Sequence, residues 1–322
     1  MTNGQRVLNE IIKRHGSNNF RIAFCPYKTE MWDSMESIFD ACVFEPNITA
    51  KIFPVPYAEV DAQGNVGIMH NESSALKQIV QNNDAFMSNL DLFKPDFVVV
   101  HYPYDNHNKV TRIHEDFWSD NLKAKGYKII HSPYGLPVGG VSTCDLTFQP
   151  VLKNAELIVC DCPEEKTNII RQWKESQDIN INPDNILVCG SPKRDYLWTA
   201  EETGTTGTVL IAGSLIPLLN GIQGNILSRY AKIIEDELAV GHKVIYRYHP
   251  LSTSGVKALC PFAYSKWLSF LGWCQTMTEN HDFAFDTEWK IQNTMNQCDH
   301  MYADSGSAVA LWIPTGKPYE EI

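Results

Sequence analysis

A group of small polar residues in the segment 302–318, YADSGSAVALWIPTGKP, has the composition of an anion site. A short apolar stretch is followed there by Asp304, Ser305, Gly306 and Ser307, and then by an expected helix. Asp and Ser cap helices, because their side-chain oxygens accept hydrogen bonds from N–H groups that lack a partner within the helix. Small residues also leave those N–H groups open to a phosphate, which the helix dipole attracts. The segment therefore predicts either a capped helix or a phosphate site.

The segment YRYHP, 246–250, places two further groups at the end of an expected strand. Alternation along the strand puts Arg247 and His249 on one face, and Pro250 ends the pairing just after His249. An arginine and a histidine so placed could hold a phosphate or diphosphate. The alternative is that His249 is a structural histidine.

The segment GSPKRD, 190–195, adds positive charge to an otherwise acidic chain. Gly190 permits close backbone approach, and a proline fixes the turn before Lys193 and Arg194. Asp195 could orient Arg194 or cap the next helix. The alternative is a solvated charge cluster.

Four expected strands of the first half end in Pro-Tyr, at Tyr27, Tyr57, Tyr104 and Tyr134. In an open parallel sheet the carboxyl ends of the strands form the ligand crevice, so these rings would gather at one rim, with Tyr27 among the substrate contacts. The alternative is that they pack beneath helices.

The segment HYPYDNHNKVTRIH, 101–114, contains three histidines and an aspartate. The spacing of His101, His107 and His114 matches no helical or hairpin pair of metal ligands, so we expect no metal. His101 and Asp105, at a strand end, are candidates for contact with substrate.

Short apolar runs alternate with longer helical stretches, a pattern typical of βαβ units and parallel sheets. The expected strands are 21–27, 50–57, 96–104, 127–135, 155–161, 185–192, 208–213, 242–250, 282–285 and 300–303, and helices are expected near 222–240, 262–278 and 287–297. The small polar residues of 199–208 indicate a linker. We therefore expect two α/β domains, 1–200 and 207–322, that face each other across a cleft. The second stops four residues after TGKP, so we expect it to be truncated or minimal.

Composition narrows the class of protein. The 322 residues carry a net charge of −11, which disfavours nucleic acid as a partner. The amino-terminal residues lack the apolar core of a signal peptide, and the uncharged run 204–228 contains Gly, Pro, Asn and Gln, which argues against a membrane span. We expect a soluble cytoplasmic protein that could work at the inner face of a membrane. Nine cysteines, at 25, 42, 144, 160, 162, 189, 260, 274 and 298, are expected to be reduced.

Taken in order, these segments resemble the CDP-glycerol glycerophosphotransferase family, which builds teichoic-acid-like poly(polyol phosphate) chains. The resemblance covers most of the chain and rests on FCPYKTEMWDSMESIFDA, PVPYAEV, GSPKRD, RYHP and ADSGS followed by GKP. It implies a bacterial protein with a glycosyltransferase-B fold, in which an acceptor-side and a nucleotide-donor Rossmann-like domain follow each other.

The resemblance also implies roles for individual residues. His249 and Arg247 would contact the donor phosphates, and the turn from Asp304 to Ser307, with Ser305 and Gly306, would bind the CDP diphosphate. Gly190, Arg194 and Asp195 match a family segment in the cleft.

One departure concerns the base that would deprotonate the acceptor. The family usually has a histidine before a glycine, whereas this chain has Tyr134 and Gly135. Tyrosine, with an ordinary pKa of about 10, is a poor base at neutral pH. His131 is the nearest substitute, but strand alternation points it to the opposite face. Gly306 also replaces the first of two adjacent serines of the family.

The resemblance implies a transferase that moves a polyol phosphate, most simply glycerol phosphate, from a CDP-activated donor to a hydroxyl group. The acceptor would be a polyol phosphate or glycan, lipid-linked or free, of a cell-wall or capsule polymer. No metal or other cofactor is expected if the protein neutralises the diphosphate itself. The alternatives are a UDP-sugar-dependent glycosyltransferase or epimerase of the same fold, and a non-catalytic binding module of a polymer-synthesis assembly.

Overall fold

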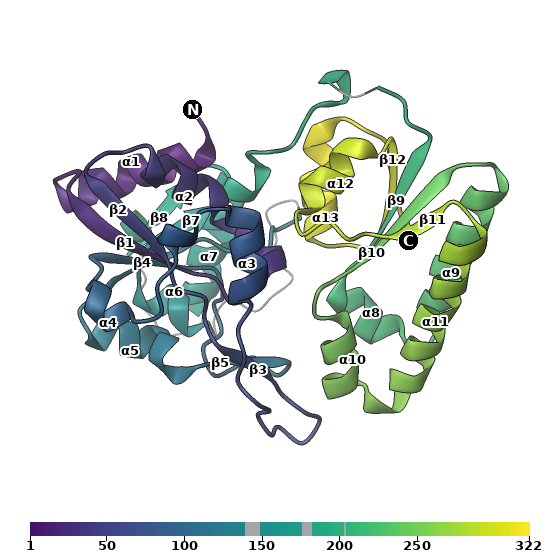
Figure 1. Ribbon diagram of the computed structural model, residues 1–322, viewed down its shortest axis with the longest axis horizontal. Coiled ribbons are helices and arrows are strands. Elements are labelled where there is room, and N and C mark those ends of the chain that lie inside the picture. Colours follow the sequence, from purple (N-terminus) through teal and green to yellow (C-terminus); the bar gives the residue numbers. More distant parts are fainter. Residues whose placement is uncertain (139–148, 176–181, 203) are drawn as a thin grey trace. The chain divides into compact units, whose positions relative to one another are not determined.

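The computed structural model describes residues 1–138, 149–175, 182–202 and 204–322 (Figure 1). The chain divides into two compact units: residues 1–58 with 68–195, and residues 59–67 with 196–322. Each unit contains its own parallel sheet, flanked by helices, which confirms the expected α/β class. Cys144 lies outside the described residues, and the eight described cysteines are free thiols.

The first unit is built on a six-stranded parallel sheet in the order β2-β1-β4-β6-β7-β8. The strands are β1 (Phe20–Cys25), β2 (Ile48–Ile52), β4 (Phe97–Val100), β6 (Lys128–His131), β7 (Ala155–Cys160) and β8 (Ile186–Val188). Several are shorter than expected. β4 and β6 end before the prolines of their Pro-Tyr pairs, because proline has no N–H to donate to the ladder. The pairs at 26–27, 103–104 and 133–134 therefore lie in loops beyond the strands, whereas Tyr57 is the first residue of a further short strand.

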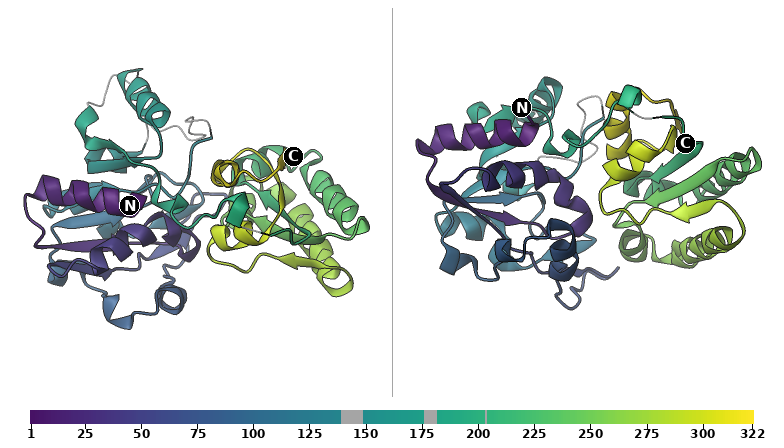
Figure 2. Two further views of the ribbon diagram at one scale, coloured as in Figure 1. Left: turned by 90° about the horizontal axis from the view of Figure 1, so that it is seen from above. Right: turned by 45° about the horizontal axis from the view of Figure 1, so that its top comes forward.

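Helices cover both faces of this sheet. They are α1 (Asn3–His15), α2 (Glu36–Val43), α3 (Ser73–Val80), α4 (Leu90–Phe93), α5 (Ser119–Ala124), α6 (Pro150–Asn154) and α7 (Pro163–Glu175). The helices α1 and α2 lie on one face, and α4 and α5 on the other (Figures 1 and 2). A separate two-stranded sheet pairs β3 (Tyr57–Glu59) with β5 (Thr111–Ile113).

The second unit has a five-stranded parallel sheet in the order β11-β10-β9-β12-β13. Its strands are β9 (Thr208–Gly213), β10 (Lys243–Tyr248), β11 (Phe283–Phe285), β12 (His300–Ala303) and β13 (Tyr319–Glu321). Its helices are α8 (Leu215–Gly221), α9 (Ile226–Ala239), α10 (Ser252–Leu259), α11 (Tyr264–Asn280), α12 (Ile291–Gln297) and α13 (Ser307–Trp312). The helix expected near 222–240 is α9, and the short helix α8 that precedes it was not expected. Gly224 and Asn225, poor helix formers, lie at the break between them.

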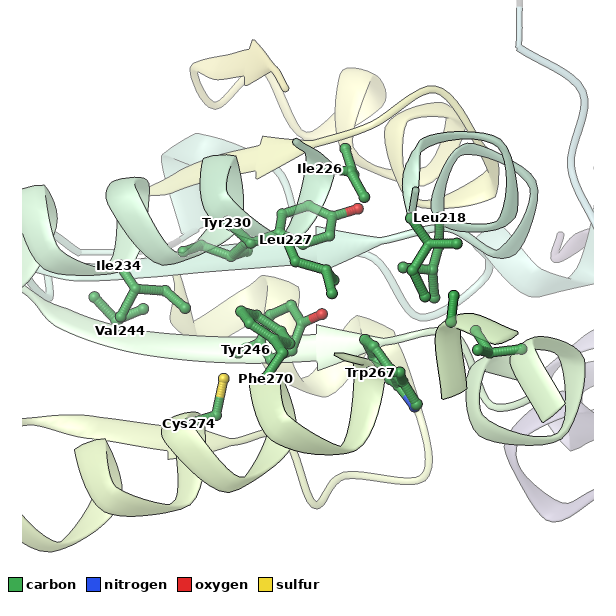
Figure 3. Packing of buried hydrophobic residues seen from close by; sticks show 14 of the residues in the cluster. Leu218, Ile226, Leu227, Tyr230, Ile234, Val244, Tyr246, Trp267, Phe270 and Cys274 are labelled. Carbon is green, nitrogen blue, oxygen red and sulfur yellow. The ribbon is translucent and has the colours of Figure 1, made fainter. Parts of the chain in front are cut away.

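An aromatic core holds one face of the second sheet against its helices (Figure 3). Tyr246 of β10 faces Tyr230 of α9 and Phe270 of α11, and all three rings are buried. The centroids of Tyr230 and Tyr246 are 5.9 Å apart, and those of Tyr246 and Phe270 are 5.7 Å apart. This packing fixes β10, and with it the loop that follows Tyr248.

No helix in the described ranges has both the length and the apolar character needed to cross a bilayer.

Candidate functional site

Three loops of the second unit meet at the carboxyl edge of its sheet. They follow β9, β10 and β12, which are adjacent and parallel in the order β10-β9-β12. These loops carry Ser214, His249 and the turn 304–307. The fold therefore brings the predicted residues of the second half to one edge of one sheet, where open α/β sheets bind ligands.

Asp304 links two of these loops by a hydrogen bond inside the unit. Its side chain is buried, one oxygen accepts a hydrogen bond from the Ser214 N–H at 2.8 Å, and the other accepts from the Tyr230 hydroxyl. Burial raises the pKa of the Asp304 carboxyl, because the charged form loses its hydration. The carboxylate thus points into the unit and fixes the turn.

Gly306 permits a close approach of the same two loops. A Cβ atom at this position would lie 2.2 Å from Ser214 Oγ. A side chain at position 306 would therefore require Ser214 to move. Ser214 was missed in the sequence analysis, although its place directly after the expected strand 208–213 is a usable signal.

The N-cap position of α13 is occupied by a glycine. This residue, Gly306, has no side chain and so makes no side-chain cap bond. The choice between a capped helix and a phosphate site therefore stays a prediction for this turn. Because α13 has only six residues, few peptide dipoles align, and the binding of an anion would depend on individual N–H groups.

His249 has a defined tautomer in the loop after β10. The Leu251 N–H donates to its Nδ1 at 3.1 Å, so Nε2 carries the proton in the neutral ring. The side chain is half-buried.

Arg247 is engaged by its own unit. Its Nη1 donates to Asp286 Oδ2 and to the Glu288 carbonyl, both at 2.7 Å, and Nη2 donates to the Trp289 carbonyl at 3.3 Å. The Arg247–Asp286 ion pair is largely buried. The guanidinium therefore holds the segment 286–289 against β10, instead of extending from the loop that carries His249.

In the first unit, Asp195 and Gly190 contact the first residues of helix α1. Both carboxylate oxygens of Asp195 accept backbone N–H bonds, from Asn3 at 2.8 Å and Gly4 at 2.9 Å. Gly190 has a φ of 86°, and a Cβ atom there would lie 2.5 Å from the Asn3 side chain. Two roles were predicted for Asp195, and the structure shows that of a helix cap. The capped helix is α1, at the start of the chain, and not the helix that follows Asp195.

Arg194 and Lys193 are paired with acidic groups of the same unit. Arg194 donates to both oxygens of Asp161, at 2.8 and 2.6 Å. Lys193 Nζ lies 3.0 Å from Asp33 Oδ1 and donates to the Tyr134 carbonyl at 3.0 Å. Asp33 and Lys193 are buried, so the alternative of a solvated charge cluster is wrong. Asp33 was missed in the sequence analysis, because nothing in its local sequence predicts this distant partner.

Two of the predicted tyrosines of the first unit, Tyr27 and Tyr134, contact His101. Ring centroids lie 5.3 Å from His101 for Tyr27 and 6.0 Å for Tyr134, and Tyr27 also contacts Tyr57 at 5.3 Å. The Tyr27 N–H donates to His101 Nε2 at 3.1 Å. Tyr27 and Tyr57 are buried and Tyr134 is half-buried, so this group lies largely in the interior at the strand ends.

The two histidines of this group are poor bases. Burial lowers the pKa of His101 to about 3 and that of His131 to about 4, because the charged imidazolium is poorly hydrated there. Neither ring nitrogen of His131 has a hydrogen-bond partner in the described part of the chain. Gly135 follows Tyr134 in the adjoining loop. At neutral pH these rings are neutral and accept a proton weakly.

Asp105 differs from these histidines in its surroundings. It is 5% exposed, and its backbone φ of 46° lies in the left-handed region. Its Oδ2 accepts from the Ser119 N–H at 2.9 Å and from Ser119 Oγ at 2.6 Å. Burial raises the pKa of Asp105 to about 6. Within the described ranges no group of three or more His, Cys, Asp or Glu side chains is arranged to hold a metal ion.

Comparison with protein families finds no family that matches the chain, and no curated protein matches it. Solved structures do match. The UDP-GlcNAc 2-epimerase of Neisseria meningitidis bound to UDP-GlcNAc is 14% identical, with a TM-score of 0.56 over 93% of this chain and 81% of that chain. MnaA of S. aureus, solved with UDP, is 12% identical, with a TM-score of 0.55 over 93% and 78%.

The wall teichoic acid polymerase TagF also matches, at 12% identity and a TM-score of 0.45 over 98% of this chain and 73% of that chain. A similarity at that level does not distinguish the CDP-glycerol family from other families of the same fold. The epimerase matches define the class: the chain has the glycosyltransferase-B fold, with two α/β units that each contain a parallel sheet.

Proposed function

We propose that this chain is a transferase that takes a polyol phosphate, most simply glycerol phosphate, from a CDP-activated donor and passes it to a hydroxyl acceptor. The observation that carries the proposal is the group of three loops at the carboxyl edge of the second sheet, with Ser214, His249 and the turn 304–307. The motifs that resemble the CDP-glycerol family favour this donor over a UDP-sugar. We assign residues 207–322 to the donor and 1–200 to the acceptor.

The spacing of these loops suits a diphosphate. Neighbouring strands lie about 4.8 Å apart, so the loops after β10 and β12 are about 10 Å apart, with Ser214 between them. A diphosphate with hydrogen bonds of about 2.9 Å on either side fills such a span. In the proposal, His249 Nε2–H donates from one side, and the N–H groups of Ser305, Gly306 and Ser307 donate from the other.

Asp304 and Arg247 act in this proposal as positioning residues. The Asp304 carboxylate would repel a phosphate, but its two oxygens are held within the unit by hydrogen bonds from the Ser214 N–H and the Tyr230 hydroxyl. Arg247 fixes the strand that ends in His249 through its bond to Asp286. This revises the sequence-based expectation that both side chains contact the donor phosphates.

The transfer step follows from these assignments. The acceptor oxygen attacks the β-phosphorus, and CMP leaves with the electron pair of the broken P–O bond. His249 and the N–H groups of the turn stabilise the charge on the phosphate oxygens.

The test is calorimetric titration of the full chain with CDP-glycerol, CDP-ribitol and UDP-GlcNAc. We expect selective binding of a CDP-polyol. Ser307→Asp places a negative charge against the phosphates and should weaken CDP-glycerol binding at least 10-fold, about 1.4 kcal/mol. The matched control is Ser228→Asp, because Ser228 is exposed in the first turn of α9, where an acidic residue is well tolerated.

Three results would count against the proposal. Unchanged affinity in Ser307→Asp removes the turn 304–307 from the donor site. Binding of UDP-GlcNAc alone favours the epimerase or glycosyltransferase alternative. Binding of CDP-glycerol with no CMP release in the presence of acceptor favours a non-catalytic module.

A further inference from the structure

Acidic residues are unevenly distributed along the second unit. Although the chain carries a net charge of −11, residues 204–234 and 238–278 contain no Asp or Glu. The acidic residues that follow these two ranges are Glu235, Asp236, Glu237 and Glu279. They belong to the last turns of α9 and α11, which both run from the carboxyl edge of the sheet back to its amino edge. The first turns of both helices therefore carry positive charge only.

Three large apolar side chains are exposed where α10 is connected to α11. Leu259 ends α10, Phe262 lies in the short 3-10 helix Pro261–Ala263, and Leu268 lies in the second turn of α11. These residues are 42%, 65% and 44% exposed. Figure 1 shows the connection at one end of the second unit. Apolar side chains that gather on an exposed surface indicate a contact with a partner.

Cationic side chains accompany these apolar residues. Lys257 in α10, Lys266 in α11 and Arg229 in α9 are all exposed. Lys266 Nζ donates to the carbonyls of Ile222 and Gly224, both at 2.9 Å, so the start of α11 is linked to the segment before α9. These acceptors are neutral, so they leave the positive charge of Lys266 uncompensated. We call the exposed side chains of residues 257–268, together with Arg229, the α10–α11 tip.

Other exposed apolar residues have acidic neighbours. Phe44 is 84% exposed, but it is followed by Glu45 and lies one helical turn after Asp40. Leu92, which is 75% exposed, follows Asp91. An anionic partner would be repelled at both places. The α10–α11 tip differs because its own segment combines apolar side chains with cations.

We propose that the α10–α11 tip docks on an anionic membrane surface. Apolar side chains that enter the boundary between headgroups and acyl chains, together with cations that meet the headgroups, bind proteins to anionic bilayers. Phe262 and Leu259 would enter that boundary, while Lys257 would lie at the headgroup phosphates. A soluble anionic polymer would use the cations alone and would leave the exposed apolar side chains without a role.

The acidic character of the whole chain does not oppose this docking. Lys266 and Glu279 lie thirteen positions apart on α11, which is about 20 Å at 1.5 Å per residue. The Debye length is about 8 Å at physiological ionic strength, so the acidic end of the helix is largely screened from a surface at the tip. The inference does not depend on which donor the second unit binds.

The test is co-sedimentation of the full chain with vesicles of phosphatidylcholine, prepared with and without phosphatidylglycerol. We expect binding that requires phosphatidylglycerol and weakens as salt is added. Phe262→Asp should weaken it at least 10-fold, because the change removes an apolar side chain and adds a like charge. Phe262→Leu should keep most of it. The matched control is Phe44→Asp, which should bind within twofold of the wild type.

Lys257→Glu tests the electrostatic part of the docking. Reversing this charge should weaken binding to phosphatidylglycerol vesicles about 10-fold at low salt and less at high salt. Because Lys257 and Phe262 are exposed, neither substitution should change the free energy of unfolding by more than about 0.5 kcal/mol, as urea unfolding can confirm.

Three results would overturn the proposal. The first is no binding to either kind of vesicle, and the second is equal binding with and without phosphatidylglycerol. The third is wild-type binding by Phe262→Asp; if Lys257→Glu then weakens binding and a soluble glycerol phosphate polymer displaces the vesicles, the tip is a site for an anionic polymer. All these measurements are made without CDP-glycerol, so their failure leaves the proposed function in place.

Discussion

At the scale of the residue, a charged residue at a predicted strand end indicates where that residue lies in the fold, but not what its side chain does. Arg247 and Asp304 lie at the predicted edge of the second sheet, yet both side chains turn into the unit and pair there. A charged group near an apolar core must find a partner, and here the partners are Asp286, Tyr230 and the Ser214 N–H. Ser214, which is less conspicuous in the sequence, becomes the more informative residue.

The buried His131 provides a prediction about pH and stability. Its folded pKa of about 4 lies below the unfolded value of about 6.5, so its contribution to stability is present above pH 6.5 and is lost as the pH falls toward 4. Between pH 7 and pH 5 the wild type should lose about 2 kcal/mol through this residue. His131→Leu should not suffer that loss, as urea unfolding at the two pH values can measure.

The control for this prediction is His107→Leu, because His107 is exposed. The gap in unfolding free energy between wild type and His131→Leu should change by about 2 kcal/mol between pH 7 and pH 5. An equal change in both variants would contradict the burial of a neutral imidazole at position 131.

At the scale of the element, the ends of some helices form hydrogen bonds with residues that are distant in the sequence. The amino terminus of α1 is capped by Asp195, and the carboxyl end of α12 is capped by Lys317, whose Nζ donates to the carbonyls of Met295, Asn296 and Cys298 at 2.9, 3.3 and 2.8 Å. Helix ends have unpaired N–H and C=O groups, so such contacts satisfy them. Two motifs of the family resemblance, GSPKRD and GKP, therefore have structural explanations.

The role of Asp195 can be tested at this scale. Asp195→Ala removes both acceptors from the start of α1 and should lower the free energy of unfolding by about 1 to 2 kcal/mol. Asp195→Asn, which keeps one acceptor, should cost less. Urea unfolding gives these values, and calorimetry should show CDP-glycerol binding within twofold of the wild type. A large loss of donor affinity with unchanged stability would favour the substrate-contact role instead.

At the scale of the whole molecule, the anion site must work against the chain's own charge. The net charge of −11 repels a nucleoside diphosphate at long range. Binding must then come from directed donors at short range, which is what the loops after β9, β10 and β12 supply in the proposed site. The three loops all belong to the second unit.

Hydrogen exchange across the whole chain can test whether the donor binds to these three loops of the second unit. CDP-glycerol at saturation should slow amide exchange in the loops that carry Ser214, His249 and the turn 304–307, because bound amides open less often. UDP-GlcNAc at the same concentration should have a smaller effect. Protection confined to residues 68–195 would place the donor in the first unit and contradict the assignment.

The sequence by itself determined the alternation of strands and helices, the parallel sheets, and the strand ends that carry polar residues. These depend on local periodicity and on where proline and glycine interrupt it, so β1, β9 and β12 lie close to their predicted ranges. The tertiary structure alone decided which way each polar side chain points. The Asp33–Lys193 pair and the Asp304–Ser214 contact join residues that are distant in sequence. The lack of a hydrogen-bond partner for one Asp105 oxygen in the described residues depends on burial. Only packing determines those.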